Sequence, residues 1–381
     1  MSENVDVSEY MADGNIDISL PDIPMPEPIE EEKKVINDEV ETAFKFCFIG
    51  SGQGGSRIAE TFHGLGYRKV CAINTAKQDL NTIKLDNKLC IGDGGAGKDP
   101  DVAGEIFDSK KEDVVDFMRY SFGDDFDRIF VCVGAGGGTG AGTLKPLVDS
   151  ALEVQETLGL KNNKVGAIVA LPKNSEGKRV NANSFKTLNT AYELVESGAV
   201  SPLIIVDNEK ISKLYPGLVV SSFWQTANRS MAGLFHLFNL TAAKDSTYSA
   251  FDSQDYGSIL DSGLMVFGAS PVKDWKDPVS ISRSVRDNLK GNILSGGINL
   301  STGSCAGVVI VGGKEALDNV PQSNLDQAYA QISRILKPNS TVHRGIYSGD
   351  KEGMTVYSCI GGLSKPEEKL KELANLGDLD N

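Results

Sequence analysis

The chain has 381 residues, of which 40% are hydrophobic, and a formal net charge of −14 at pH 7. This length favours about two packed domains, and no segment reaches the ~18 continuous apolar residues that a membrane span needs. The lack of a basic patch argues against direct nucleic-acid binding. The six cysteines form no CxxC pair, which argues against a disulfide framework. The three histidines are scattered along the chain, which argues against a histidine-centred metal or catalytic site.

The acidity is concentrated at the start of the chain. Residues 1–41 contain 13 acidic and 2 basic residues, a net charge of −11, so the remaining chain carries only −3. Such a segment cannot bury enough apolar surface to offset its chain entropy, so we predict a disordered leader that solvates the protein or contacts a basic partner. It lacks the basic and apolar regions of a cleavable signal, which predicts a cytoplasmic protein.

From Thr42 onward, strand-like and helical segments alternate. Apolar runs predict strands at 44–49, 69–75, 89–91, 128–133, 165–171 and 203–206, and helical spacing predicts helices at 56–65, 113–122, 143–158 and 184–197. Asp99 is placed to cap a further helix that has Pro100 at its first position. The alternation predicts an α/β fold with a doubly wound parallel sheet, covered on both faces. A ligand is then expected at the carboxyl ends of the strands.

Three glycine-rich loops follow strands of this sheet. Residues 134–142 contain six glycines, whose bare backbone can approach an anion and turn several N–H groups toward it. A helix follows, and its N-terminus adds to the phosphate cradle. The loops at 50–55 and 92–98 are imperfect dinucleotide and P-loop motifs, because the second strand does not end in an acid and Asp99 stands where a P-loop has Ser or Thr. Together, the three loops fit several backbone segments around one triphosphate.

The rest of the chain predicts a long central helix and a second, smaller α+β domain. Apolar side chains lie nearly all round residues 218–240, which is typical of a buried helix. Beyond it, strands are predicted at 264–270, 305–313, 342–347 and 354–362, and helices at 280–289 and 324–336. The tail at 364–381 is short and charged.

The glycine loops and several later segments occur in the order found in the tubulin/FtsZ family, which the chain resembles over about residues 44–363. Gly136–Gly140 looks like the signature loop of that family. The resemblance implies a guanine-nucleotide site made by Gly52, Gln53, Gly54, Gly55, Asn74, Gly95, Ala96, Gly97, Gly136, Gly137, Gly138, Thr139, Gly140, Glu176, Arg179, Asn208 and Asn228. Arg57 and Lys98 are further candidates for phosphate contacts or for surface roles.

Two parts of the resemblance leave alternatives. For base recognition we favour Asn228 over its neighbour Arg229, because an amide can pair with the guanine edge whereas an arginine would place donors against donors. Residues 250–256 resemble the catalytic loop of the family, which implies that Asp252 and Asp255 orient the attacking water and a cation. On their spacing alone these acids would be helix-capping or solvated groups. Ala250 replaces the Asn that begins the family's loop, which leaves open a nucleotide-binding scaffold without turnover.

The resemblance also implies the domain plan and the activity. It predicts a disordered acidic leader (1–41), a GTP-binding domain (42–216), a central helix (217–241), a C-terminal activation domain (242–363) and a charged tail (364–381). GTP and Mg²⁺ are the implied ligands, with no residue assigned to the metal. Because the catalytic loop of one subunit acts on the nucleotide of the next, the interface is heterologous and generates a filament.

The cellular role follows from finer resemblances. Gln53 and the segment 202–208 favour the TubZ and phage-tubulin branch, whose members segregate or position plasmid or phage DNA. A DNA-bound adaptor protein is then an expected partner besides the chain itself, and no membrane partner is expected. An FtsZ-like role in cell division is the alternative within the family. Outside it, the first glycine loop leaves an NAD(P)-dependent oxidoreductase as the alternative.

Overall fold

The computed structural model describes residues 41–160, 163–217, 219–277, 279–349 and 352–379, so the predicted acidic leader lies outside the described residues except for Glu41. In chain order the strands are β1 (Phe46–Ser51), β2 (Val70–Asn74), β3 (Lys88–Cys90), β4 (Arg128–Gly134), β5 (Val165–Leu171), β6 (Val200–Asp207), β7 (Leu264–Pro271), β8 (Cys305–Gly313), β9 (Thr341–Gly349) and β10 (Met354–Leu363).

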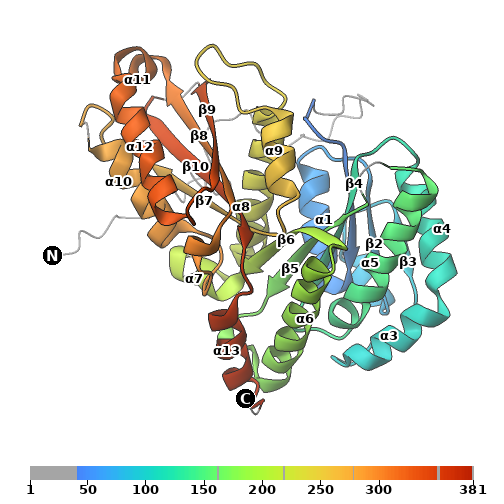
Figure 1. Ribbon diagram of the computed structural model, residues 1–381. Coiled ribbons are helices and arrows are strands. Elements are labelled where there is room, and N and C mark those ends of the chain that lie inside the picture. The colour runs from blue at the N-terminus through green and yellow to red at the C-terminus, as the bar shows by residue number, and fades with distance from the viewer. Residues whose placement is uncertain (1–40, 161–162, 218, 278, 350–351, 380–381) are drawn as a thin grey trace.

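These ten strands of the described chain form one continuous sheet in the order β3-β2-β1-β4-β5-β6-β7-β10-β8-β9 (Figure 1). Pairing is parallel from β3 to β7, antiparallel on both sides of β10, and parallel again between β8 and β9. The two halves meet where Leu203 and Ile204 of β6 pair with Leu264 and Met265 of β7. The α/β fold class is confirmed, and the strands predicted for the second domain extend the same sheet.

Helices cover both faces of the sheet (Figure 1). They are α1 (Gly52–Gly64), α2 (Lys77–Asn81), α3 (Pro100–Ser109), α4 (Lys111–Phe122), α5 (Thr139–Thr157), α6 (Lys178–Glu196), α7 (Asn208–Leu214), α8 (Val220–Thr241), α9 (Ser253–Leu260), α10 (Ser280–Asp287), α11 (Lys314–Asn319), α12 (Gln322–Ile335) and α13 (Glu367–Leu376). One core lies under α3–α6 and α10–α13, and the other under α1, α2 and α7–α9. Successive strand residues alternate between these cores, as Phe48 and Ile49 do, because strand side chains have a period of two.

Parts of two glycine-rich segments are the first turns of helices, and three predicted helix starts are corrected. The structure begins α1 at Gly52, α5 at Thr139 and α6 at Lys178, each earlier than predicted. Gly52 has a φ of +70°, so the chain turns from β1 into α1 within one residue. The backbone N–H groups in these segments therefore include the free donors of the first helical turns.

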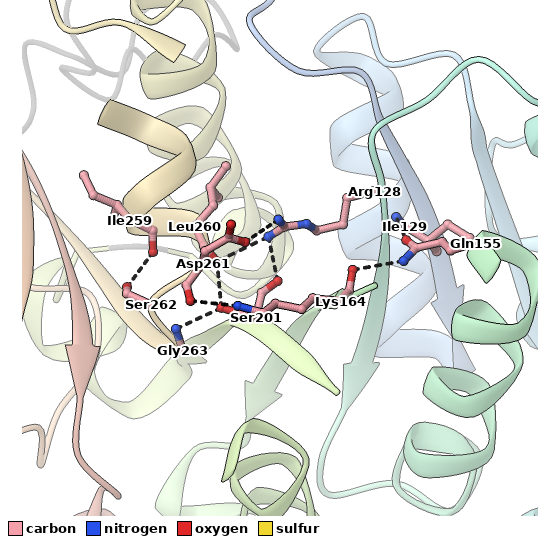
Figure 2. Close-up of polar contacts among 10 residues, drawn as sticks. All are labelled: Arg128, Ile129, Gln155, Lys164, Ser201, Ile259, Leu260, Asp261, Ser262 and Gly263. Atoms are coloured by element: carbon pink, nitrogen blue, oxygen red, sulfur yellow. Dashed lines mark hydrogen bonds and ion pairs between the residues drawn. The ribbon is translucent and has the colours of Figure 1, made fainter. Parts of the chain in front are cut away.

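The C-terminal end of α9 is fixed at the amino edge of the parallel strands (Figure 2). Arg128, the first residue of β4, is 4% exposed and donates through Nη1 to the carbonyl oxygens of Ser201 (2.7 Å) and Leu260 (3.2 Å). Its Nη2 lies 2.6 Å from Asp261 Oδ1. This cluster joins β4, β6 and the α9–β7 turn, and so locks the second half of the molecule onto the first.

The predicted charged tail contains a packed helix, α13, which lies beside α6 (Figure 1). Its face with Leu370 and Leu373 is buried. Lys369 is only 6% exposed at its side chain, and its Nζ lies 2.9 Å from Asp207 Oδ2 and 2.6 Å from Glu372 Oε2. The tail is therefore part of the folded body, anchored at the end of β6.

One of the three histidines is buried in the core. His236, on α8, is 2% exposed, and its Nδ1 lies 3.2 Å from the hydroxyl of Tyr67. Burial lowers the pKa of His236 to about 4, so the ring is neutral at pH 7.

Among the helices of the described chain, none is long and apolar enough to cross a membrane.

Candidate functional site

A cavity of about 430 Å³ lies at the carboxyl edge of the parallel strands. Three glycine-rich segments surround it, together with the ends of β2, β5 and β6 and the first half of α8. Its lining residues are Ser51, Gly52, Gln53, Gly54, Arg57, Asn74, Thr75, Ala76, Asp79, Gly95, Ala96, Gly97, Lys98, Gly134, Ala135, Gly136, Gly137, Gly138, Thr139, Gly140, Ala170, Pro172, Glu176, Val180, Asn208, Trp224 and Asn228. Residues of all three loops therefore line one cavity, which is the arrangement expected if they surround one ligand.

Most residues predicted to bind the nucleotide lie on this cavity. Fifteen of the seventeen line it, and the two that do not are Gly55 and Arg179. A side chain at Gly55 would place its Cβ 2.0 Å from the carbonyl oxygen of Cys132, so this glycine allows α1 to pack against β4. The structure thus gives Gly55 a role in packing, and its contact with the ligand stays a prediction.

Arg179 instead ties the third glycine segment to α6. Its Nη2 lies 3.3 Å from Asp99 Oδ2, and Asp99 also caps α3 by accepting the N–H of Asp101. Asn183, one turn further along α6, donates to the carbonyl oxygen of Lys98 at 3.0 Å. Lys98 has a φ of +60°, an unfavourable conformation for a residue with a side chain. These contacts hold a strained loop against the cavity.

The signature loop approaches the third segment so closely that only glycine fits. A Cβ on Gly138 would lie 2.8 Å from the backbone nitrogen of Asp99 and 2.9 Å from Ala96 Cβ. Thr139 begins α5 directly after it, so first-turn N–H groups face the cavity with the positive end of the helix dipole. Bare backbone, free donors and this dipole are the features of a phosphate site.

The opposite part of the cavity carries amide groups. Asn208, the first residue of α7, is 3% exposed, and its Oδ1 is buried with no hydrogen-bond partner among the described residues. Asn228 also lines the cavity, whereas its neighbour Arg229 is exposed and does not. An acceptor that is buried and unpartnered is costly unless a ligand donates to it. This end of the cavity is therefore suited to a nucleobase.

Several lining residues were not assigned to the ligand from the sequence, and Trp224 and Asp79 are two of them. Trp224 is 36% exposed on the cavity and stands one helical turn before Asn228, a spacing that could have revealed it. Instead, the apolar pattern of the helix assigned this tryptophan to the core. Asp79 accepts a hydrogen bond from Asn74 Nδ2 at 3.3 Å. The aromatic ring supplies a flat apolar surface, and the carboxylate supplies an oxygen ligand.

The charged side chains on the cavity balance one another. Arg57 and Lys98 face it with Asp79 and Glu176, so the lining offers no net positive charge against a triphosphate. No group of three His, Cys, Asp or Glu residues in the described ranges could hold a metal ion. Mg²⁺ commonly uses only one or two carboxylates together with substrate phosphates, so Asp79 and the Thr139 hydroxyl fit a cation that arrives with the nucleotide.

Asp252 and Asp255 lie at the N-terminus of α9, away from this cavity. Asp252 accepts the N–H groups of Gln254 and Asp255 at 2.9 Å, and Asp255 accepts the N–H of Asp252 at 3.3 Å. These bonds form a reciprocal capping box. The capping role expected from spacing alone is thus present, and it fixes both carboxylates at one surface.

The distance from these acids to the cavity follows from the helix between them. Tyr347 Oη accepts the N–H of Phe251 at 2.9 Å and lies 2.9 Å from the carbonyl oxygen of Thr241, the last residue of α8. Asn228 lines the cavity thirteen residues earlier on α8, a rise of about 20 Å. Burial, together with the charges of Asp255 and Asp252, raises the pKa of Tyr347. The acids and the cavity therefore occupy opposite ends of the molecule.

Comparison with known proteins agrees with this geometry. Residues 45–216 match the family described as "Tubulin/FtsZ family, GTPase domain". The tubulin-like protein TubZ of Bacillus cereus is 24% identical over 68% of this chain, and the matched region covers 63% of TubZ. Cell division protein FtsZ 1 of Methanocaldococcus jannaschii is 26% identical, with 82% of this chain and 80% of FtsZ 1 covered.

The fold has a close structural counterpart. The crystal structure of a GTPγS-form protofilament of Bacillus thuringiensis serovar israelensis TubZ superposes with a TM-score of 0.77. It covers 89% of this chain and 92% of that chain, at 17% identity. A likeness at this level of identity shows that the two chains share their fold.

Proposed function

Residues 45–216 belong to the tubulin/FtsZ GTPase-domain family, and on that premise we propose that the whole chain binds and hydrolyses GTP while assembling head to tail into filaments. The matched relatives include TubZ and FtsZ proteins, and the structural counterpart is a TubZ protofilament in its GTPγS form. The family match covers less than half of the chain, so the activity of the whole chain is part of this proposal.

The cavity supports GTP as the ligand. Gly138 and Thr139 lie where bare backbone and a helix N-terminus would receive the phosphates. Asn208 Oδ1 would accept a hydrogen bond from an N–H group of the guanine edge, which satisfies the buried acceptor. Trp224 would stack on the base. Asp79 and Thr139 would hold Mg²⁺ through the phosphates, and the ion would supply the positive charge that the lining lacks.

The observation that carries assembly is the separation of Asp252 and Asp255 from the cavity. A rise of about 20 Å along α8 prevents these acids from reaching a nucleotide in their own chain. They lie at the opposite end of the same molecule, so a second copy placed head to tail would bring its acids to the first copy's phosphates. Such an interface does not close on itself and generates a filament.

Hydrolysis would then depend on assembly. Phosphoryl transfer needs positioning and charge stabilisation more than covalent help. Asp252 and Asp255 would orient the attacking water at the interface, and their shared capping box would keep them in place. Ala250, where the family has Asn, removes one polar contact from this loop and favours slow turnover.

For the cellular role we propose cytoplasmic segregation or positioning of plasmid or phage DNA, through an adaptor protein that binds the DNA. The Gln53 segment and the likeness to TubZ support this role. A division-ring role is the second candidate, supported by the FtsZ relatives.

The test is phosphate release by the purified full chain with GTP and Mg²⁺ over a range of protein concentrations, with electron microscopy of the same samples. We expect turnover per molecule to rise with concentration, and filaments to form with GTP in preference to GDP. A chain that turns over at full rate as a monomer, or that binds NAD and not GTP, would contradict the proposal.

A further inference from the structure

His343 lies against the first turn of α9, although it is distant in sequence from that helix. It belongs to β9, the strand at the edge of the sheet, and its side chain is 18% exposed. Its Nδ1 lies 2.5 Å from Asp255 Oδ1, and its Nε2 lies 3.0 Å from Ser258 Oγ. The ring therefore contacts two residues of α9 that are one turn apart.

Asp255 is held at both of its carboxylate oxygens, whereas Asp252 is held at one. Asp255 is engaged at both oxygens, because Oδ2 accepts the N–H of Asp252 and Oδ1 meets His343. An ionised carboxylate can only accept, so Nδ1 of His343 carries the proton in this contact. Asp252 uses Oδ1 for both of its capping bonds, and no hydrogen bond to its Oδ2 is found within the described residues.

We propose that His343 is a positioning residue for GTP hydrolysis: it holds the Asp255 carboxylate in the orientation that meets the nucleotide of the neighbouring subunit. This inference rests on the proposed function, since it assumes that Asp255 acts across the interface. The capping bond holds only Oδ2 of Asp255, so the carboxylate could still turn about that contact. The contact between His343 and Oδ1 fixes the second oxygen as well. Misplacing a catalytic group by about 1 Å can cost roughly a hundredfold in rate.

If His343 had only a structural role, its contacts would be the same, but substituting it would have different effects. If His343 only fastened β9 to α9, any substitution would act on folding or assembly, and the contact to Ser258 would matter as much as the contact to Asp255. If it positions Asp255, the loss is confined to the chemical step and to the Nδ1 side of the ring. The two amide residues separate these cases, because Asn places its amide near the position of Nδ1 and Gln places its amide near that of Nε2.

The experiment compares H343N, H343Q and H343A in the full chain. We expect H343Q and H343A to lower kcat by about tenfold or more, and H343N to recover most of that loss. The KM for GTP and the assembly measured by light scattering should change little in all three, because the cavity lies at the far end of the molecule. Equal kcat for H343N and H343Q, or an unchanged kcat in H343A, would overturn the positioning role.

The variant D255N separates failure of this inference from failure of the proposed function. If D255N loses turnover while H343A keeps it, Asp255 is catalytic and His343 does not position it. If D255N keeps full turnover, the proposed role of Asp255 is wrong and the inference falls with it. In the double variant, H343A should add no further loss to that of D255N, since both act on one carboxylate.

Discussion

At the scale of single residues, the site depends on residues whose roles are set by the atoms that surround them. Gly138 cannot carry a side chain because Asp99 and Ala96 lie against it. Asn208 has a buried acceptor on the cavity that no other described residue satisfies. The sequence showed the glycine through its pattern, but the unpartnered amide became evident only when the surrounding side chains were in place.

Trp224 provides a direct signal for ligand binding. Because it lines the cavity and is 36% exposed, an adjacent base should change its emission. Titration of the full chain with GTP is expected to shift or quench tryptophan fluorescence. The chain has only one other tryptophan, Trp275, so W275F should keep the response and W224F should lose it. A response that survives in W224F would place the nucleotide elsewhere.

Asp255 can be tested by changing its charge alone. D255N keeps the size of the side chain and its ability to accept the Asp252 N–H, so the α9 capping box should survive. We expect filaments to form while phosphate release falls by about a hundredfold or more, the range typical for loss of an acid–base group. Light scattering and phosphate release on one sample measure both. Turnover at the parent rate would remove Asp255 from catalysis.

At the scale of elements, the fold uses helix ends to place chemistry. The starts of α1, α5 and α7 all lie on the cavity, and the start of α9 carries the acids. The spacing predicted α1 and α5 but placed their starts too late, because a glycine-rich sequence resembles a loop, and it did not predict α7. The ion pair between Lys369 of α13 and Asp207 of β6 could not be predicted from the sequence either, since the two residues are 162 positions apart.

The α13 contact should contribute measurably to stability. Lys369 and Asp207 have side-chain exposures of 6% and 1%, and removing one partner of such a pair costs about 3–5 kcal/mol. Because Asp207 also accepts the N–H groups of Lys210 and Gly296, we expect K369M to cost about 3 kcal/mol. Thermal unfolding measures this loss. The control is K371M on the exposed face of α13, which should leave the melting temperature nearly unchanged.

The same contact predicts a pH window. Burial opposes the charge on Lys369, but Asp207 outweighs it and the pKa of Lys369 is raised above 10.5, so its contribution is lost as pH rises through that higher pKa. Burial also opposes the charge on Glu372, but Lys369 and Asn174 lower its pKa below 4.5, so its contribution is lost as pH falls below 4.5. We therefore expect the free energy of unfolding of K369M to depend less steeply on pH than that of the parent chain, both below pH 4.5 and above pH 10.5.

At the scale of the whole molecule, one sheet fixes the distance between the two functional ends. Arg128 fastens α9 at the amino edge of the strands (Figure 2). The cavity lies at their carboxyl edge. A strand of seven residues such as β4 spans about 20 Å, which agrees with the distance along α8. The molecule is thus built with a ligand site at one end and acids at the other.

Mixing two inactive variants tests this arrangement. G138V should prevent GTP binding, because its side chain would collide with Asp99, and D255N should bind GTP without cutting it. Each is expected to release little phosphate alone. When mixed, the intact acids of G138V meet the intact pocket of D255N across an interface, so turnover should reappear. A mixture that stays inactive although both chains co-sediment with GTP would argue against a shared site.

The sequence by itself determined most of the strands and helices and the three glycine segments, because these depend on spacing along the chain, and it singled out the acids of α9 through the resemblance to the tubulin/FtsZ family. It also placed fifteen residues that come together on one cavity. Only the tertiary structure decided that both halves share one sheet, that Trp224 faces the cavity, and that His343 and Lys369 meet acids far away in sequence. Such contacts arise where separate elements pack together, and no local pattern along the chain encodes which side chains will meet there.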